Sequence, residues 1–181
     1  MKLAVVGATG AVGREMLRAL EERDFPAEQV VALASPRSDG VRLPFRGGEA
    51  VVRAVGDDAF QDVDLALFSP GAAASREWAP RAVAAGAVVV DNSSAFRMDP
   101  GVPLVIPEVN AEAIETHRGI VANPNCTAIT AVMAVAPLHR AARLARLVVS
   151  SYQSVSGAGQ RGVRELLEQV EKLRGQEEEL A

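Results

Sequence analysis

The sequence has 181 residues, of which 49% are hydrophobic and 23% are charged, and its formal net charge at pH 7 is -4. This hydrophobic fraction excludes an intrinsically disordered chain, and the mild acidity argues against binding to nucleic acids or anionic membranes. The sequence contains no apolar run of about 20 residues, the length that a bilayer-spanning helix needs.

The first half of the sequence alternates between short apolar strands and helices. Strands are predicted, in chain order, at Lys2–Val6, Gln29–Ala34, Val51–Val55, Asp64–Phe68 and Ala87–Asp91. Helices are predicted at Ala11–Arg23 and Ala72–Ala85, and Pro36–Gly48 is predicted to be a loop or an irregular hairpin. This alternation predicts βαβ units and therefore an α/β fold, a largely parallel sheet covered by helices on both faces.

The second half continues with longer segments. The predicted elements are short strands at Leu104–Ile106 and Ile120–Ala122, an apolar helix at Thr127–Ala142, a long strand at Leu144–Val155 and an amphipathic helix at Arg161–Arg174. The acidic run Glu177–Glu179 is predicted to be the solvated, frayed end of that helix.

A glycine-rich turn, Gly7–Gly13, joins the first predicted strand to the first helix. At this position Gly7 permits a tight turn, Gly10 lets a pyrophosphate approach the backbone, and Gly13 allows close packing of helix on strand. The start of the helix adds free N–H groups and a partial positive charge. A nucleotide site is therefore favoured over a structural glycine turn.

The residues after the second strand indicate which dinucleotide binds. An NAD site usually places a carboxylate here to bind the ribose 2′-hydroxyl, but the strand is followed by Ser35-Pro36-Arg37-Ser38, and the first carboxylate is Asp39. Arg37 and Ser38 can instead hold a 2′-phosphate through charge-assisted hydrogen bonds. NADP is therefore the predicted cofactor, with a solvated loop arginine as the alternative.

Cys126 is the only cysteine, so an intrachain disulfide is excluded, which fits a reducing compartment such as the cytoplasm. It follows Asn123-Pro124-Asn125 at the start of an apolar helix, where the positive end of the helix favours the thiolate. Asn125 or nearby N–H groups can stabilise an oxyanion. We predict a nucleophile that oxidises an aldehyde through a thioester, although a lone cysteine is more often a small buried hydrophobe.

Two further loops follow predicted strands, at the sheet edge where α/β proteins bind ligands. Arg97, in the loop after Asp91, is a candidate anchor for a carboxylate or phosphate, with a surface ion pair as an equal alternative. Gln153 can hydrogen-bond a substrate, and Ser156 and Gly157 allow close backbone approach.

Trp78 is interpreted as a packing residue. No metal site is predicted. The aspartates that could suggest one are typical of turns, and they are Asp57, Asp58, Asp62 and Asp64.

With these motifs in place, the sequence resembles the aspartate-semialdehyde dehydrogenases. The matching pieces, in the family's order, are Gly7–Gly13, Asn92–Arg97, Pro107–Asn110, Asn123–Thr127 and Tyr152–Gly159. The nearest competing family, the N-acetyl-glutamyl-phosphate reductases, typically has Asn-Pro-Gly-Cys where this sequence has Asn-Pro-Asn-Cys at 123–126.

The resemblance implies a phosphate-dependent, NADP-dependent interconversion of aspartate 4-semialdehyde and 4-phospho-aspartate, on the route to lysine, threonine and methionine. It implies that Cys126 carries the thioacyl intermediate, that Arg97 binds phosphate, and that Gln153 and Asn125 contact the substrate. The residues that it implies for NADP binding are Gly7, Thr9, Gly10, Ala11, Val12, Gly13, Arg37, Ser38, Ser156 and Gly157. It also implies a homodimer or tetramer.

The sequence departs from the family in one respect, the general base that such an enzyme needs beside the thiol. His139 is predicted on the same helix as Cys126 at roughly 20 Å, and His117 lies in a polar loop. Family members are longer, so we expect residues 1–125 to form a Rossmann-like NADP-binding domain and residues 126–181 the first part of a second α+β domain for catalysis and dimerisation. The alternative from another class is a non-catalytic nucleotide-binding module.

Overall fold

The computed structural model describes residues 1–174, and the contacts of its backbone divide the chain between Val148 and Val149 into two units. The first unit contains all the strands found within residues 1–174. The run Glu177–Glu179 lies outside the described residues.

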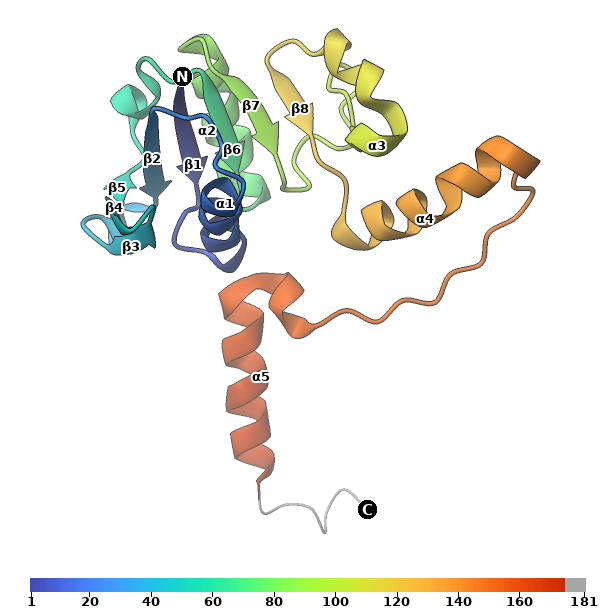
Figure 1. The fold of residues 1–181 in the computed structure, drawn as a ribbon. Coiled ribbons are helices and arrows are strands. Elements are labelled where there is room, and N and C mark those ends of the chain that lie inside the picture. The colour runs from blue at the N-terminus through green and yellow to red at the C-terminus, as the bar shows by residue number, and fades with distance from the viewer. Residues whose placement is uncertain (175–181) are drawn as a thin grey trace. The chain divides into compact units, whose positions relative to one another are not determined.

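A six-stranded parallel sheet forms the centre of the first unit (Figure 1). Its strands lie in the order β5-β2-β1-β6-β7-β8. They are β1 (Lys2–Val6), β2 (Gln29–Ala34), β5 (Arg53–Ala54), β6 (Leu65–Phe68), β7 (Val88–Asp91) and β8 (Ile120–Ala122). The chain builds outward from β1 to one side and from β6 to the other, so the order reverses between these two strands. This doubly wound topology confirms the predicted fold class.

Helices cover both faces of the sheet because successive strand residues point to opposite sides. On one face, Leu3 and Val5 of β1 pack in a cluster with Leu17 of helix α1 (Ala11–Glu22). On the other face, Ala4 and Val6 belong to a cluster with Phe60, Phe68 and two alanines of helix α2 (Ala72–Ala84). Figure 1 shows α1 and α2 on opposite sides of the strands.

The segment after β2 differs in part from the prediction. After a short 3₁₀ turn at Pro36–Ser38, Arg42–Phe45 (β3) and Gly48–Val51 (β4) form an antiparallel hairpin, one of the two predicted forms. The single strand predicted at Val51–Val55 is wrong as a continuous element. Val52 is fully buried and exchanges backbone hydrogen bonds with Gly40 and Val41, so the chain leaves the hairpin there before β5 joins the main sheet.

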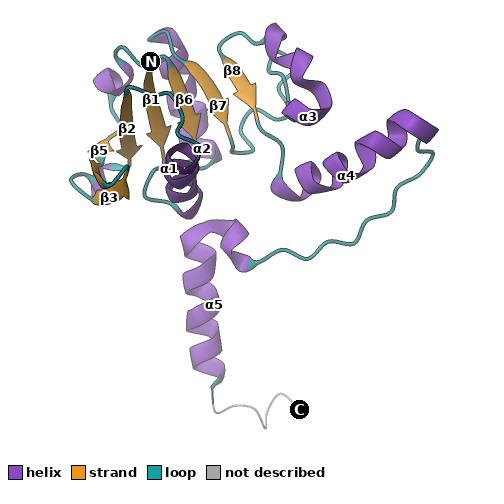
Figure 2. Ribbon diagram, viewed as in Figure 1, coloured by secondary structure: helices purple, strands orange, loops and turns teal. Residues whose placement is uncertain are grey.

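Two other predicted strands are also wrong. Leu104–Ile106 forms only an isolated bridge, between Leu104 and Ala122. Figure 2 shows the chain from Arg143 to Ser154 as loop, so the long strand predicted at Leu144–Val155 does not form. A strand exists only when its N–H and C=O groups pair with a neighbour, and among residues 1–174 no strand pairs with this segment.

The remaining helices are α3 (Pro107–Asn110), α4 (Cys126–Ala142) and α5 (Gly159–Leu173). The last two confirm the predicted helices to within two residues at each end. Short 3₁₀ segments lie at Asp57–Phe60, Ala111–Thr116 and Val155–Ala158. None of the helices within residues 1–174 combines the length and the apolar composition that crossing a bilayer requires.

Candidate functional site

The glycine-rich turn has the backbone geometry that its sequence predicts. Gly7 has a φ of 86°, and its N–H and that of Ala8 both donate to the carbonyl of Leu33 at the end of β2. A Cβ on Gly7 would lie 2.7 Å from the Ser69 backbone. Gly10 is the N-cap of α1 and has no side chain to occupy the first N–H groups of the helix. The turn therefore leaves a helix N-terminus open to an anion.

Gly13 is expected to be essential for packing this turn. A Cβ at this position would lie 2.2 Å from the Gly7 carbonyl oxygen and 2.7 Å from the Ala8 Cα, both backbone atoms that cannot move aside. Gly13→Ala should therefore lower the free energy of unfolding by about 3 kcal/mol, measured by urea denaturation. Gly56→Ala is the matched control, because its Cβ would meet no atom within 4 Å. Equal stability of the two variants would contradict the close approach.

A cavity of about 490 Å³ opens at the point where the strand order reverses. Its lining comes from the ends of β1, β2 and β6, and from α2. The lining residues are Val6, Gly7, Thr9, Gly10, Ala34, Ser35, Pro36, Arg37, Val55, Ser69, Pro70, Ala74, Glu77 and Trp78. Open α/β sheets bind their ligands in this crevice, beyond the carboxyl ends of the strands.

Four of the ten predicted cofactor residues line this cavity. Gly7, Thr9, Gly10 and Arg37 line it, and the Thr9 hydroxyl lies 3.3 Å from the hydroxyl of Ser38. The predicted residues 11–13 form the first turn of α1 directly behind the glycine turn. Arg37 and Ser38 thus stand beside the glycine turn.

The wall formed by α2 was not predicted as part of this site. Trp78 packs near Phe60, with ring centroids 6.5 Å apart, and the guanidinium of Arg81 lies 4.6 Å from its ring centroid. This confirms a packing role, but Trp78 and Glu77 also line the cavity. The signal that could have found them is the topology of the sheet. Helix α2 follows β6, which lies next to β1 where the strand order reverses.

Cys126 is the first residue of α4 and is exposed. Asn125 is the N-cap of this helix, and its side-chain oxygen accepts hydrogen bonds from the N–H groups of Thr127 and Ala128 at 3.0 and 3.3 Å. The cysteine therefore stands at the positive end of a capped helix of 17 residues. Because the side-chain oxygen of Asn125 already accepts these two hydrogen bonds, Asn125 would contact a substrate through its side-chain NH₂ group.

Arg97 lies beside the cysteine loop. Its Nε donates to the carbonyl of Asn123, and its Nη2 donates to the carbonyl of Asn92, both at 2.9 Å. The guanidinium therefore bridges the loops that follow β7 and β8, and it is half-buried. Because β1, β6, β7 and β8 are parallel neighbours, their carboxyl ends share one edge, so Arg97, the cysteine loop and the cavity lie along the same edge.

The remaining predicted residues belong to the second unit. The Ser154 hydroxyl accepts a hydrogen bond from the Ser156 N–H, and the side chain of Gln153 lies against Gly157. All three predicted residues, Gln153, Ser156 and Gly157, thus cluster at the start of α5. Their contacts with a substrate and a cofactor remain predictions.

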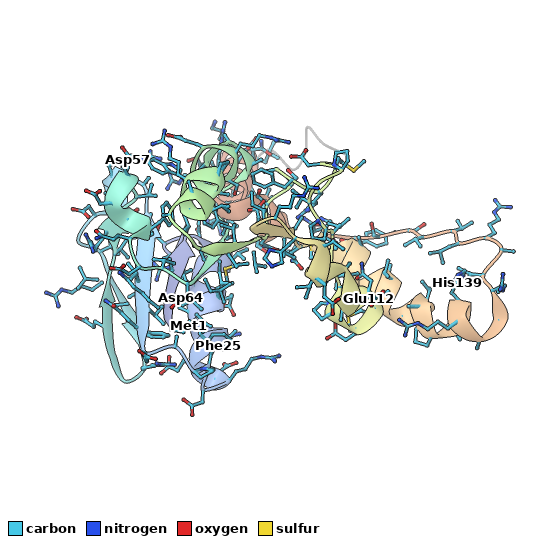
Figure 3. The ribbon with its side chains drawn as sticks, turned by 90° about the horizontal axis from the view of Figure 1, so that it is seen from above. Met1, Phe25, Asp57, Asp64, Glu112 and His139 are labelled. Carbon is cyan, nitrogen blue, oxygen red and sulfur yellow. The ribbon has the colours of Figure 1, made fainter. Side chains whose placement is uncertain are left out.

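The two histidines lie on elements that do not bring them next to Cys126. Figure 3 labels His139 near the end of α4 opposite to the cysteine, a separation of roughly 20 Å along the helix. Its Nδ1 accepts a hydrogen bond from the Leu144 N–H. His117 follows a 3₁₀ turn, and its Nδ1 accepts from the Gly119 N–H.

Comparisons with known proteins match both parts of the chain. Residues 2–117 match the family model "Semialdehyde dehydrogenase, NAD binding domain", and residues 135–180 match "Semialdehyde dehydrogenase, dimerisation domain". The chain is 50% identical over 172 residues to an aspartate-semialdehyde dehydrogenase of Aquifex aeolicus, covering 93% of this chain and 51% of the relative. It is 47% identical over 178 residues to that of Bacillus subtilis, covering 98% and 51%.

Solved structures give the same result. Aspartate semialdehyde dehydrogenase II from Vibrio cholerae superposes with a TM-score of 0.90 at 47% identity, over 96% of this chain and 52% of that one. The chain thus spans about half the length of the relatives it matches. The glycine turn, the doubly wound sheet and the match over residues 2–117 agree, and the chain belongs to the semialdehyde dehydrogenase family.

Proposed function

We propose that this chain carries the NADP site and the nucleophile of an enzyme that interconverts aspartate 4-semialdehyde and 4-phospho-aspartate. The observation that carries the proposal is the placement of two features on one edge of a parallel sheet. These are the cavity beside the glycine turn and Cys126 at the capped start of α4. The relatives at about 50% identity bear the name of this activity.

The cavity residues fit NADP better than NAD. The glycine turn and the open N-terminus of α1 suit a pyrophosphate, and Arg37 offers a cation where the adenosine 2′-phosphate would lie. Asp39, the first carboxylate after β2, accepts a hydrogen bond from the Ala54 N–H at 2.8 Å. That carboxylate therefore helps to hold β5, which supports the assignment of the 2′ position to Arg37 and Ser38. When bound, NADP would accept or supply the hydride.

The cysteine divides the reaction into two easier steps. In the oxidative direction, the Cys126 thiolate adds to the aldehyde carbon to give a thiohemiacetal, and loss of a hydride and a proton leaves a thioester. Inorganic phosphate then attacks the thioester carbonyl, the C–S bond breaks, and 4-phospho-aspartate and the thiolate are released. We assign the developing oxyanion to the NH₂ group of Asn125, because the Thr127 and Ala128 N–H groups already donate to the side-chain oxygen of this residue.

Three side chains would hold the substrate. We assign the phosphate to Arg97, because its guanidinium is joined to Asn123 of the cysteine loop by a hydrogen bond of 2.9 Å. Gln153 would orient the substrate, and the Asn125 NH₂ group would line the same pocket. Ser156 and Gly157 would contact NADP. Each assignment is supported by motif position in the sequence.

The assembly and location follow the family pattern. We propose a homodimer or tetramer, supported by the match of residues 135–180 to a dimerisation domain. We propose the cytoplasm as its location, because an enzyme that depends on the thiolate of Cys126 needs a reducing compartment. The pathway would be the biosynthesis of lysine, threonine and methionine.

Turnover with two aldehydes tests the proposed substrate. In the native polypeptide that contains this sequence, phosphate-dependent reduction of NADP should show a kcat/KM at least about tenfold higher for aspartate 4-semialdehyde than for N-acetyl-glutamate 5-semialdehyde. The reason is that an extra methylene and an acetyl group must fit the same pocket. A preference for the N-acetylated aldehyde would assign the reductase reaction instead. NADP binding without turnover of either would favour a non-catalytic nucleotide-binding module.

A further inference from the structure

The loop that carries Cys126 is tied to the end of β7 by hydrogen bonds that converge on Asn92. The Asn123 Nδ2 donates to the Asn92 Oδ1 at 2.6 Å, and Arg97 donates to the carbonyls of both asparagines at 2.9 Å. One amide pair and one guanidinium thus join two neighbouring loops in a closed ring of contacts. Asn92 contributes both of its oxygen atoms to this ring.

Asn92 is itself fixed from the buried side. Its N–H donates to the Phe68 carbonyl at the end of β6 at 2.8 Å. The preceding residue, Asp91, is fully buried, and its carboxylate accepts hydrogen bonds from the hydroxyls of Ser75 on α2 and Ser93 at 2.8 and 2.7 Å. A satisfied buried carboxylate holds the turn that presents Asn92, so Asn92 is a rigid point of attachment.

The path from Asn123 to the cysteine is short and has little freedom. The Asn123 N–H donates to the Asp91 carbonyl at 2.8 Å, which continues the pairing of β8 with β7. Pro124 is buried, and its ring restricts φ. Asn125 then caps α4 through the N–H groups of its first turn. The position of the α4 N-terminus therefore depends on where Asn123 is held.

We propose that Asn92 is a positioning residue for Cys126, acting through Asn123 to hold the start of α4. This inference rests on the proposed function only for its consequence in catalysis, since the mechanical link exists whichever reaction the thiol performs. A loss of this link should loosen the first turn of α4 and lower kcat, because the nucleophile must be held within a narrow range of geometry. The KM for NADP should not change, because Asn92 does not line the cavity.

Asn92→Ala, which removes the side-chain oxygen and keeps the carbonyl, tests the link. Amide hydrogen exchange at Thr127 and Ala128 should be about fivefold faster, the effect of losing one net hydrogen bond of about 1 kcal/mol. In the native polypeptide that contains this sequence, kcat should fall by at least about fivefold. Asn92→Asp keeps an acceptor for Asn123 and should restore the slow exchange.

Asn110→Ala is the matched control. The Asn110 side chain likewise makes structural hydrogen bonds: its oxygen accepts from the Ile106 N–H at 2.8 Å and its NH₂ donates to the Leu104 carbonyl at 3.0 Å. These bonds stay within residues 104–110 and do not reach the loop that carries Cys126. It should change neither exchange at the start of α4 nor kcat. If Asn92→Ala does not fold, Asn123→Ala carries the same expectation, because it removes the donor and leaves no polar group to which the Asn92 amide could turn. Exchange as in the unmodified protein, or the same acceleration in Asn110→Ala, would overturn the inference. An unchanged kcat despite faster exchange would overturn the positioning role.

Discussion

Replacing Cys126 with serine in the native polypeptide that contains this sequence is expected to lower kcat for oxidation of aspartate 4-semialdehyde by at least about 1,000-fold. The serine hydroxyl has nearly the shape of the thiol, but it is not ionised at neutral pH and makes a poor leaving group when phosphate attacks. The start of α4 should keep its structure, because Asn125 provides the cap and remains in place. Steady-state kinetics, with binding of NADP measured in parallel, would separate lost chemistry from lost folding.

Thr127→Ala is the control for this substitution. Thr127 is the next residue of α4. Its backbone N–H is not altered by the substitution and still donates to the Asn125 side chain. We expect its activity to stay within about threefold of the unmodified protein, since small changes of exposed polar contacts alter free energies by about 0.5 kcal/mol. Retained dehydrogenase activity in Cys126→Ser would remove the cysteine from the mechanism.

The second large effect concerns the choice of cofactor. Arg37→Glu is expected to weaken NADP binding by about 30- to 150-fold, because a hydrogen bond to a charged phosphate is worth about 2 to 3 kcal/mol. NAD binding should change by less than about threefold or improve, since a carboxylate at this position can accept from the ribose 2′-hydroxyl. Trp78 lines the cavity and is the one tryptophan of this 181-residue sequence, so its fluorescence can report both titrations.

Arg23→Glu makes the same change of charge at a distance from this cavity. Arg23 is the exposed C-cap of α1, at the opposite end of the helix from the glycine turn. It should affect NADP and NAD equally and by less than about threefold, as expected for a surface charge screened by salt. An equal loss of both cofactors in Arg37→Glu would refute the assignment of Arg37 to the 2′-phosphate.

The parts of the fold that local chemistry determines could be predicted from the sequence. The apolar runs of β1 and β7 and the glycine turn before α1 specify a buried parallel sheet without reference to the rest of the chain. The apolar segment 144–155 has the same local pattern, but a strand also needs a partner that sequence periodicity does not supply. There Leu147 and Val148 are 51% and 76% exposed.

The candidate site divides in the same way. Thr9, Arg37 and Cys126 could be found from the sequence because each lies next to a turn whose geometry depends on neighbours in the chain. The pairing of Asn92 with Asn123 joins the residues that directly follow two strands, so it depends on the register of β7 and β8. Glu77 and Trp78 reach the cavity because the strand order reverses between β1 and β6, which is a property of the whole sheet.

The covalent state of Cys126 during turnover tests the central claim most directly. The native polypeptide that contains this sequence would be incubated with aspartate 4-semialdehyde and NADP without phosphate, and its peptides analysed by mass spectrometry. The account predicts one aspartyl group on the peptide that contains Cys126, released as 4-phospho-aspartate when inorganic phosphate is added. Formation of NADPH with no acyl group on this peptide would contradict it.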